Sequence, residues 1–324
     1  MVIALDAMGG DFAPASAING AILASEKLAT KNVTILLVGD TAVIENHLAE
    51  SGQALPANIQ IVHASEVIEM GEHPAKALQQ KQDSSIAVGF GLLVKGKAQA
   101  FCSAGNTGAM LVGSMFSVKP LPGLIRPAIV GFVPRPSGKT GVILDVGANA
   151  DVKPEVLAQF GEMGSLYAQY VLNIENPVVG LMNIGEEEGK GNALVQAAYQ
   201  LLKTNDKITF HGNIEGRDLF TDLVDVVVCD GFTGNIILKL SESIHDIMQE
   251  HKIATDEFFD QLNYELHGGS PIIGVNGNVI IGHGLSSPLA IANMVKQCER
   301  MIASDINTKL KNALLETSLE KKDE

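Results

Sequence analysis

Short apolar runs recur along the whole chain of 324 residues, and many of them end at a glycine, aspartate, asparagine or serine. The runs are rich in valine and isoleucine and too short for helices, so each is expected to form a buried strand. The stretches between them are long enough for helices, which predicts an α/β protein whose mostly parallel sheet is covered by helices on both faces. The expected strands are Val2–Leu5, Val33–Val38, Ile59–Val62, Ala98–Cys102, Ile129–Val133, Val142–Leu144, Val178–Met182, Val226–Val228 and Val279–Ile281.

The segment Ser241–Leu266 departs from this rhythm and is expected to form a short projecting helical hairpin, an insertion over residues 241–267. Its first helix is expected to end near His251, and its second to begin with Thr255 as the N-cap residue. Apolar side chains follow helical spacing in both halves. Such a one-sided hairpin is typical of a contact between subunits, and the alternative is that it folds back onto its own core.

No low-complexity linker or exact repeat divides the chain, so residues 1–324 are expected to form a single domain. Its final helix is expected to begin at Pro288 with Ser287 as the N-cap residue, because proline is favoured at the first helical position. Residues 320–324 are expected to fray. Met1–Asp6 lacks the basic and apolar segments of a signal peptide and is expected to form the first strand.

The composition narrows the class of protein. Apolar residues make up 46% of the chain and tryptophan is absent, so the core must be aliphatic. The formal net charge of −14 argues against nucleic acid as a partner, because duplex binding depends on a basic surface. No apolar window reaches the length of a membrane span. Cys102, Cys229 and Cys298 lack metal-site spacing and favour buried thiols in a reduced, cytoplasmic protein.

The charge is unevenly distributed along the chain. Between Lys76 and Lys153 there are nine basic and three acidic residues, although the protein as a whole is acidic. A basic zone of this kind attracts an acidic partner or a phosphorylated ligand, and a chance cluster of solvated charges is the alternative. The residues expected to meet an acidic partner are Lys95, Lys97, Arg126 and Arg135.

The stretch Asp225–Lys239 gives the strongest indication of chemistry. A buried strand at Val226–Val228 is followed by Asp230, an expected polar loop at Phe232–Asn235 and a helix from Ile236. A loop of this kind directs several backbone N–H groups towards one point at a helix N-terminus, which favours an anion. The stretch therefore predicts a site for a phosphate-like group.

Five further loops rich in glycine, hydroxyl and amide groups follow other expected strands. In open α/β sheets, ligands bind outside the carboxyl ends of the strands, so these loops are expected to gather at one edge. A single loop of this composition is usually only a turn, but the whole set favours a polyanion or phosphoryl site. The five are Asp6–Asp11, Ser103–Gly108, Asp145–Asp151, Asn183–Asn192 and Ile281–Ser287.

Several enzyme motifs are absent from the sequence. There is no P-loop, no GxGxxG after the first strand, no GxSxG elbow, no HExxH and no paired CxxC, so the corresponding nucleotide, hydrolase and zinc chemistry is not indicated. The triplet Glu186–Glu188 is either a site for a hard cation or a solvated loop. In the absence of an obvious nucleophilic side chain, the bound ligand itself is expected to be the nucleophile.

Taken in order, these motifs resemble the bacterial phosphate acyltransferases, the PlsX family, nearly from end to end. They stand at Asp6–Asp11, Ser103–Ala109, Leu144–Asn149, Lys190–Asn192, Gly212–Asp218, Asp230–Asn235, Gly274–Gly277 and Gly282–Gly284. The resemblance implies a three-layer α/β/α sandwich of the isopropylmalate dehydrogenase and phosphotransacetylase type. It also implies a homodimer with no metal and no organic cofactor.

The activity implied by the resemblance is that of an acyl-[acyl-carrier-protein]:phosphate transacylase. Inorganic phosphate attacks the thioester of a long-chain acyl carrier protein, and the acyl phosphate feeds glycerol-3-phosphate acylation in phospholipid biosynthesis. Such an enzyme is expected in the cytoplasm, with a functional link to a membrane glycerol-3-phosphate acyltransferase. The hairpin is shorter than the family's and has only Ile253 as an apolar anchor at its turn, so peripheral membrane contact is not favoured.

The needs of this reaction give two expected catalytic residues: we expect Lys190 to clamp phosphate and Asn235 to polarise the thioester carbonyl. Phosphate needs to be desolvated and held about 3 Å from the carbonyl carbon, while hydrogen-bond donors stabilise the oxyanion. Asp6 and Asp230 are expected to organise substrate-binding loops, since a carboxylate repels phosphate. The other expected substrate-binding residues are Gly9, Gly10, Ser103, Asn106, Thr107, Asn149, Asn192, Thr233, Gly234, His283 and Ser286.

Three other functions stay open. A phosphotransacetylase-like enzyme would use acyl-coenzyme A as the acyl donor instead of a carrier protein. A dehydrogenase on the related fold would need a nucleotide fingerprint and an acidic metal cluster. A non-catalytic scaffold would not need so many donor-rich loops at one sheet edge.

Overall fold

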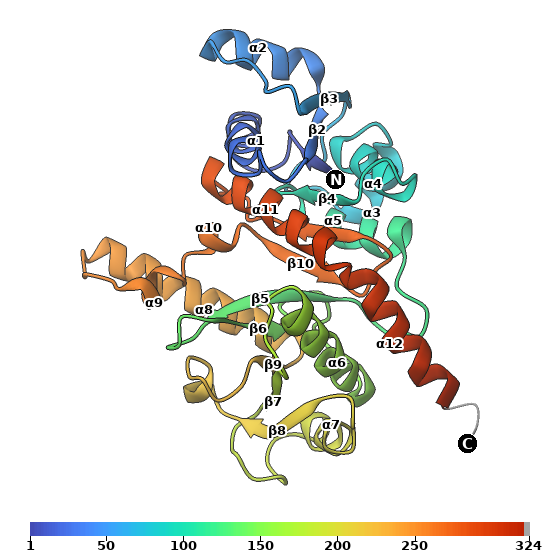
Figure 1. Ribbon diagram of the computed structural model, residues 1–324, viewed down its shortest axis with the longest axis vertical. Coiled ribbons are helices and arrows are strands. Elements are labelled where there is room, and N and C mark those ends of the chain that lie inside the picture. The colour runs from blue at the N-terminus through green and yellow to red at the C-terminus, as the bar shows by residue number, and fades with distance from the viewer. Residues whose placement is uncertain (321–324) are drawn as a thin grey trace. The chain divides into compact units, whose positions relative to one another are not determined.

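The computed structural model of the chain describes residues 1–320, with side chains up to residue 314. Residue contacts divide it into two compact units (Figure 1). Unit 1 comprises Met1–Pro120 and Tyr264–Asp305, and unit 2 comprises Leu121–Asn263 and Ile306–Glu324. The single domain expected over the whole chain stays a prediction. The expected fraying concerns mainly residues 321–324, which lie outside the described part.

Unit 1 is built around a sheet with the strand order β3–β2–β1–β4–β11–β10. Neighbouring strands are parallel, except for the antiparallel pair β10–β11. The strands are β1 (Val2–Asp6), β2 (Thr34–Gly39), β3 (Ile59–His63), β4 (Ala100–Ser103), β10 (Ser270–Ile273) and β11 (Asn278–Ile281). The helices are α1 (Ala15–Lys27), α2 (Thr41–Ser51), α3 (Pro74–Gln80), α4 (Ser85–Val94), α5 (Thr107–Gly113), the π-helix η1 (Ser114–Val118), α10 (Tyr264–His267) and α11 (Pro288–Ser304).

Unit 2 contains the strand order β5–β6–β9–β7–β8, in which only the hairpin β5–β6 is antiparallel. Helix α6 packs on β6, β7 and β9, whereas α8 contacts β5 and β6. The strands are β5 (Ala128–Pro134), β6 (Thr140–Leu144), β7 (Val178–Met182), β8 (Thr209–Ile214) and β9 (Val226–Val228). The helices are α6 (Pro154–Tyr170), α7 (Ala193–Lys203), the 3-10 helix η2 (Gly216–Asp218), α8 (Gly231–Glu250), α9 (Glu257–Asp260) and α12 (Ile306–Glu320).

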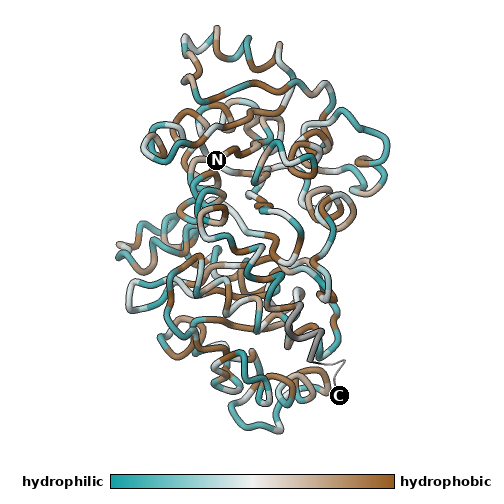
Figure 2. The backbone as a smooth tube through the Cα atoms, turned by 45° about the vertical axis from the view of Figure 1, so that its right-hand side comes forward, coloured by the Kyte–Doolittle hydropathy of each residue, from teal (hydrophilic) through white to brown (hydrophobic). Residues whose placement is uncertain are grey.

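The cores of both units are aliphatic, as the composition predicts. Ile3, Leu5 and Leu37 are fully buried in unit 1, and Leu144 and Val226 are fully buried in unit 2. Figure 2 shows stretches of hydrophobic residues, in brown, and of hydrophilic residues, in teal, along the backbone of both units. Each fully buried aliphatic side chain contributes about 1.5–3 kcal/mol relative to an exposed one, so these strands hold the loops at their ends in place.

All nine expected strands are present, with small shifts at their ends, and the mostly parallel α/β class is confirmed. Two strands are missing from the prediction. The pattern of β8 is interrupted by His211 and Gly212, and β10 contains Pro271, which argues against a strand because proline removes a ladder donor. In β10, Pro271 is accommodated in the antiparallel pair with β11.

The helix predictions need three corrections. The residues expected to form a loop before Ile236 are the first turn of α8, which begins at Gly231. The second helix of the hairpin is two single turns, α9 and α10, and Asp256 rather than Thr255 caps the first of them. The helix from Pro288 is capped by Ser287 as expected, but α12 follows it after Asp305, which has a φ of 51°.

Two further expectations concern the thiols and the membrane. The three cysteines are free and buried, which confirms the expected buried thiols. Within the part of the chain that the structure describes, no helix is both long and apolar enough to cross a bilayer.

Candidate active site

Three loops of unit 1 meet at the carboxyl edge of its sheet, because β1, β4 and β11 are parallel and β4 lies between the other two. Backbone hydrogen bonds join the loops directly. Asp11 N–H donates to the Gly284 carbonyl at 2.8 Å, and Gly282 N–H donates to the Ser103 carbonyl at 2.8 Å. The loops expected at Asp6–Asp11, Ser103–Gly108 and Ile281–Ser287 therefore form one cluster within unit 1.

Asp6 is the buried centre of this cluster. Its carboxylate accepts hydrogen bonds from the Ser103 hydroxyl at 2.6 Å and from Met8 N–H at 2.9 Å. Ser103 Oγ in turn accepts Gly105 N–H at 2.9 Å. Burial raises the pKa of the Asp6 carboxyl, although hydrogen bonds from Ser103 and other neighbours oppose the shift. These contacts support the loop-organising role expected of Asp6.

Gly9 and Gly10 permit the close approach of these loops. A Cβ atom on Gly9 would lie 2.5 Å from Asp6 Oδ2 and 2.6 Å from Gly105 N. Gly10 has a φ of +97°, which side chains other than glycine rarely adopt, and a Cβ there would lie 3.1 Å from the Gly284 carbonyl oxygen. Both glycines are therefore required by the backbone at this edge.

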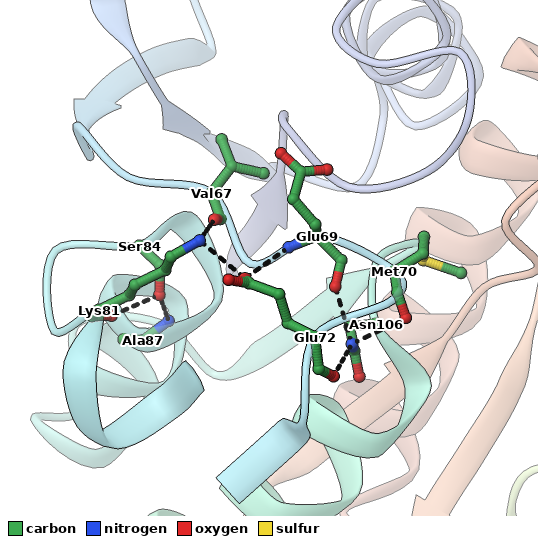
Figure 3. Close-up of polar contacts among 8 residues, drawn as sticks. All are labelled: Val67, Glu69, Met70, Glu72, Lys81, Ser84, Ala87 and Asn106. Atoms are coloured by element: carbon green, nitrogen blue, oxygen red, sulfur yellow. Dashed lines mark hydrogen bonds and ion pairs between the residues drawn. The ribbon is translucent and has the colours of Figure 1, made fainter. Parts of the chain in front are cut away.

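Asn106 fixes the segment 69–72 to the start of α5 (Figure 3). Its side-chain oxygen accepts Ala109 N–H at 2.9 Å and so caps the helix. Its amide nitrogen lies 2.9 Å, 3.2 Å and 3.1 Å from the carbonyl oxygens of Glu69, Met70 and Glu72. Both the nitrogen and the oxygen of the Asn106 side-chain amide therefore bind the protein itself. These contacts support a role for Asn106 in positioning the segment 69–72, and they leave the amide less available to a ligand.

His283, Ser286 and Thr107 lie at the rim of the same cluster. The Ser286 hydroxyl donates to the His283 carbonyl at 2.6 Å, and His283 Nδ1 accepts Leu285 N–H at 3.2 Å. The His283 ring lies 4.8 Å from the ring of Tyr264, centroid to centroid. Thr107 is exposed as the first residue of α5. His283 and Ser286 thus stabilise the turn before α11.

In unit 2, the loop after β6 is organised by the buried carboxylate of Asp145. This group accepts hydrogen bonds from the backbone of Ile129 at 2.9 Å, Ala148 at 3.1 Å and Asn149 at 2.7 Å. The Asn149 amide donates to Asp145 at 3.0 Å and to the Pro127 carbonyl at 2.8 Å. Burial raises the pKa of the Asp145 carboxyl, and these hydrogen bonds oppose the shift.

The N-terminus of α8 packs directly on this loop. Asp230 caps the helix by accepting Thr233 N–H at 2.8 Å and the Thr233 hydroxyl at 2.8 Å. Gly231 N–H donates to the Asn149 carbonyl at 2.8 Å. A Cβ atom on Gly234 would overlap the Asp145 carbonyl oxygen. The two glycines therefore let the first turn of α8 touch the loop after β6.

Asn235 stands one residue beyond this contact, and its side chain is exposed. A Cβ atom on Gly147 would lie 3.5 Å from Asn235 Oδ1, so the amide borders the loop after β6. Within residues 1–314, where side chains are described, the Asn235 amide has no hydrogen-bond partner. An exposed amide at the start of a 20-residue helix is available to a ligand, and the helix dipole favours negative charge there.

Lys190 lies in the loop between β7 and α7. Its backbone is held by hydrogen bonds to the Glu187 carbonyl at 3.0 Å and from the Asn183 amide at 3.1 Å. Its ammonium is 3.9 Å from Glu187 Oε2 and half exposed. Asn192 caps α7 by accepting Val195 N–H at 3.1 Å. Because β6, β9 and β7 are adjacent and parallel, Lys190 and Asn235 stand at the same sheet edge.

The acidic triplet Glu186–Glu188 is not arranged as a cation site. Glu186 pairs with Arg217 at 2.7 Å, Glu187 with Lys190 at 3.9 Å and Glu188 with Lys203 at 2.9 Å. The three carboxylates thus pair with three different basic side chains. Among the described residues, no group of three or more histidine, cysteine, aspartate or glutamate side chains is placed to hold a metal ion.

The expectation that Arg135 of the basic zone meets an acidic partner is wrong. This side chain is buried, forms an ion pair with Asp225 and lies 3.3 Å from Asp222. It ties the β5–β6 hairpin to the start of β9 and is not accessible to an acidic partner. Lys95, Lys97 and Arg126 are exposed. The nine basic residues fall in both units, so proximity in sequence does not make them one surface.

The expected site residues therefore fall into two groups. Unit 1 brings together Asp6, Gly9, Gly10, Ser103, Asn106, Thr107, His283 and Ser286, whereas unit 2 brings together Asn149, Lys190, Asn192, Asp230, Thr233, Gly234 and Asn235. Asp145 is not among the expected site residues, although an aspartate directly after an expected strand and before a glycine is the same pattern that identified Asp6.

The family model described as "Fatty acid synthesis protein" matches residues 1–309. The chain belongs to this family. A phosphate acyltransferase of Dictyoglomus turgidum is 41% identical over 332 residues, covering 97% of this chain and 98% of the relative. A phosphate acyltransferase of Pelotomaculum thermopropionicum is 44% identical over 334 residues, covering 96% of each chain. The acyltransferase class expected from the resemblance is thereby confirmed.

Solved structures confirm the fold class. A phosphotransacetylase from Streptococcus pyogenes superposes with a TM-score of 0.64 at 16% identity, covering 94% of each chain. A branched-chain phosphotransacylase from Enterococcus faecalis gives a TM-score of 0.60 at 15% identity, covering 93% of this chain and 99% of that one. At these identities the likeness concerns the α/β/α architecture alone.

Proposed function

We propose that the chain is a phosphate acyltransferase that transfers a long-chain acyl group from the thioester of an acyl carrier protein to inorganic phosphate. The observation that carries this proposal is the Asn235 amide at the N-terminus of α8. It is exposed, has no hydrogen-bond partner among the described side chains and borders the loop held by Asp145. The names of the relatives support phosphate as the acyl acceptor.

The proposed reaction is a nucleophilic acyl substitution. A phosphate oxygen attacks the thioester carbonyl carbon, a C–O bond forms and negative charge develops on the carbonyl oxygen. The tetrahedral intermediate collapses, the C–S bond breaks, and the thiolate of the carrier leaves and takes up a proton. Phosphate is already ionised at neutral pH, so positioning and charge stabilisation supply the catalysis.

Asn235 and Lys190 take the two catalytic roles in this proposal. The Asn235 amide donates to the developing oxyanion, aided by the helix dipole. The Lys190 ammonium leaves its loose pair with Glu187, 3.9 Å away, to bind phosphate. Asp230, Asn149 and Asn192 already make protein hydrogen bonds as caps and loop braces, so we assign them to shaping the site.

The decisive experiment is to trap the product. The purified chain is incubated with palmitoyl-acyl carrier protein and inorganic phosphate, and hydroxylamine converts any acyl phosphate into a hydroxamate that is measured directly. Hydroxylamine also reacts with the carrier thioester itself, so we expect hydroxamate in excess of that formed in a control without phosphate and in a control without the chain. The absence of this excess in a folded preparation would remove the proposed function. Palmitoyl-coenzyme A in place of the carrier tests the alternative of a phosphotransacetylase-like enzyme, which predicts the faster reaction with that donor.

We further propose a cytoplasmic homodimer in which α8 forms the contact between subunits. Only Gly231 and Gly234 of this helix are buried, and its exposed apolar side chains follow one face. The partners proposed with it are the carrier protein and, as the consumer of the acyl phosphate, a membrane glycerol-3-phosphate acyltransferase. The side chains of this face are Phe232, Ile236, Leu240 and Ile247.

A further inference from the structure

The motif Gly212–Asp218 takes no part in the proposed chemistry itself and begins near the end of β8 in unit 2. Its second residue, Asn213, is 3% exposed. The Asn213 amide nitrogen donates to the Glu187 carbonyl at 2.9 Å, whereas the amide oxygen has no hydrogen-bond partner within residues 1–314. A buried amide therefore links this motif to the loop that carries Lys190.

A bulge in β8 precedes Asn213. The register between β7 and β8 shifts by one residue, so His211 is an extra residue in β8. Gly212 follows with a φ of +120°, which side chains other than glycine rarely adopt. A bulge re-aims the side chains that follow it. Here the next side chain is that of Asn213, which is buried and bonded to the loop after β7.

The backbone of Lys190 is held on both sides by groups that lead back to the end of β8. The Glu187 carbonyl accepts the Asn213 amide and also Lys190 N–H, the latter at 3.0 Å. The Lys190 carbonyl accepts the Asn183 amide at 3.1 Å. Asn183 N–H in turn donates to the Ile214 carbonyl at 2.8 Å. Asn213 and the residue after it thus fix the two backbone contacts of Lys190.

The stem of the Lys190 side chain lies against Gly185. A Cβ atom on Gly185 would stand 2.9 Å from Lys190 Cγ and 3.2 Å from Lys190 Cδ. The ammonium at the end of the stem is half exposed and 3.9 Å from Glu187 Oε2. A fixed backbone and a supported stem therefore present this charge at a defined position.

We propose that Asn213 is the positioning residue for Lys190 and thereby sets the affinity of the site for inorganic phosphate. This inference rests on the proposed function, in which Lys190 binds phosphate. Lysine has a flexible stem, so its ammonium binds an anion more tightly when the protein has already ordered it. Asn213 acts through the Glu187 carbonyl, which it shares with Lys190 N–H.

Asn213→Leu tests this role, because it removes the amide and keeps the branched framework of the side chain. The Glu187 carbonyl still accepts Lys190 N–H, so the substitution leaves this carbonyl with a hydrogen bond. Asn278→Leu is the matched control. Asn278 is 8% exposed, and its amide donates to the Gln99 carbonyl at 2.9 Å, at the amino end of β11 in unit 1.

The first measurement does not depend on catalysis. Lysines are acetylated with sulfo-N-hydroxysuccinimide acetate, and peptide mass spectrometry follows Lys190 at rising concentrations of inorganic phosphate. We expect phosphate to protect Lys190 in the unmodified chain. The concentration for half-protection should rise about tenfold in Asn213→Leu, because the charge-assisted contact with phosphate is weakened. Asn278→Leu should match the unmodified chain, and Lys203, paired with Glu188 at 2.9 Å, reports any general effect of phosphate on the reagent.

The hydroxamate assay gives the second readout. In Asn213→Leu the KM for phosphate should rise, while the KM for palmitoyl-acyl carrier protein stays unchanged. A merely structural defect would lower the amount of active chain, and so kcat, and leave both KM values as they are. If Asn213→Leu does not fold, Asn213→Ser, whose hydroxyl is too short to reach the Glu187 carbonyl, provides the same measurements.

The outcomes separate this inference from the proposed function. If no excess hydroxamate forms, the proposed function fails, and the protection of Lys190 still decides the role of Asn213. If phosphate does not protect Lys190 in the unmodified chain, the inference is overturned. Equal protection of Lys190 in the unmodified chain and in a folded Asn213→Leu variant also overturns it and leaves the proposed function standing. A parallel rise of both KM values would assign Asn213 to general support of the fold and count against the inference.

Discussion

At the scale of single residues, Asn235 and Asn106 each follow a strand of a parallel sheet, yet their amides have different surroundings. The Asn106 amide nitrogen faces three carbonyl oxygens and its oxygen caps α5. The Asn235 amide is exposed beside Gly147. From the sequence, both residues are predicted to donate to a ligand, because each lies in a polar motif that follows a strand. The difference arises from the segment 69–72, which is distant in sequence from Asn106 and occupies its amide, whereas the Asn235 amide stays exposed and is the proposed ligand donor.

Asn235→Asp should abolish most of the activity while leaving the fold intact. The substitution replaces an N–H donor with a carboxylate of the same shape, next to the expected position of an oxyanion. Loss of one such donor lowers kcat roughly 100-fold or more. Gln249→Glu makes the same change of charge on the exposed surface of α8 and should retain activity. Near-normal turnover of a folded Asn235→Asp variant contradicts the assignment.

Asp6 predicts a pH dependence of stability. Burial raises its pKa in the folded state above the ordinary value of about 4. The folded state therefore binds the proton more tightly than the unfolded state, and the chain loses stability relative to Asp6→Asn as pH rises through the raised pKa. Urea unfolding of both proteins between pH 4 and pH 7 measures the difference. A difference that grows in favour of Asp6 at higher pH would contradict the prediction.

Ser103→Ala provides the companion measurement for Asp6. Burial raises the pKa of the Asp6 carboxyl, and the hydrogen bond from the Ser103 hydroxyl is the strongest of the contacts that lower it. Its removal should raise the pKa of Asp6 further and extend the loss of stability to higher pH. An unchanged pH profile would show that Ser103 does not stabilise the ionised form.

At the scale of elements, the start of α8 depends on glycine at position 234. Gly234→Ala would force a Cβ atom into the Asp145 carbonyl oxygen, which is backbone and cannot move aside. The free energy of unfolding should fall by about 2–4 kcal/mol, the cost of severe overpacking. Gly216→Ala is the control, because a Cβ atom there meets open space and should change stability by only about 0.5 kcal/mol. Urea unfolding measures both.

The same element shows where sequence reasoning succeeds and where it stops. The buried strands could be predicted because their runs of valine and isoleucine have no competing interpretation. The first turn of α8 could not, since Gly231, Thr233 and Gly234 have low helix propensity and their sequence is typical of a loop. Helix forms there because Asp230 caps it and the glycines fit against the loop after β6. That contact is tertiary and leaves no local pattern.

At the scale of the whole molecule, the proposed homodimer predicts the effect of Leu240→Glu. Leu240 is 63% exposed at the middle of the apolar face of α8. A charge at the centre of an apolar contact lacks a partner and opposes association. Light scattering should report the mass of a dimer for the unmodified chain and of a monomer for the variant. Gln249→Glu should remain a dimer, and a dimeric Leu240→Glu would assign the contact to another surface.

The buried thiols allow the unfolding of each unit to be measured separately. Cys102 and Cys298 belong to unit 1 and Cys229 belongs to unit 2, and burial raises the pKa of Cys102 and Cys229 well above the usual value of a thiol. A folded thiol of this kind is protected from alkylation, since the reagent needs access and a thiolate. Mass spectrometry after pulses of iodoacetamide in increasing urea therefore yields separate labelling curves for the two units. Coincident curves would mean that residues 1–324 open as one cooperative body, and separated curves would rank the units by stability.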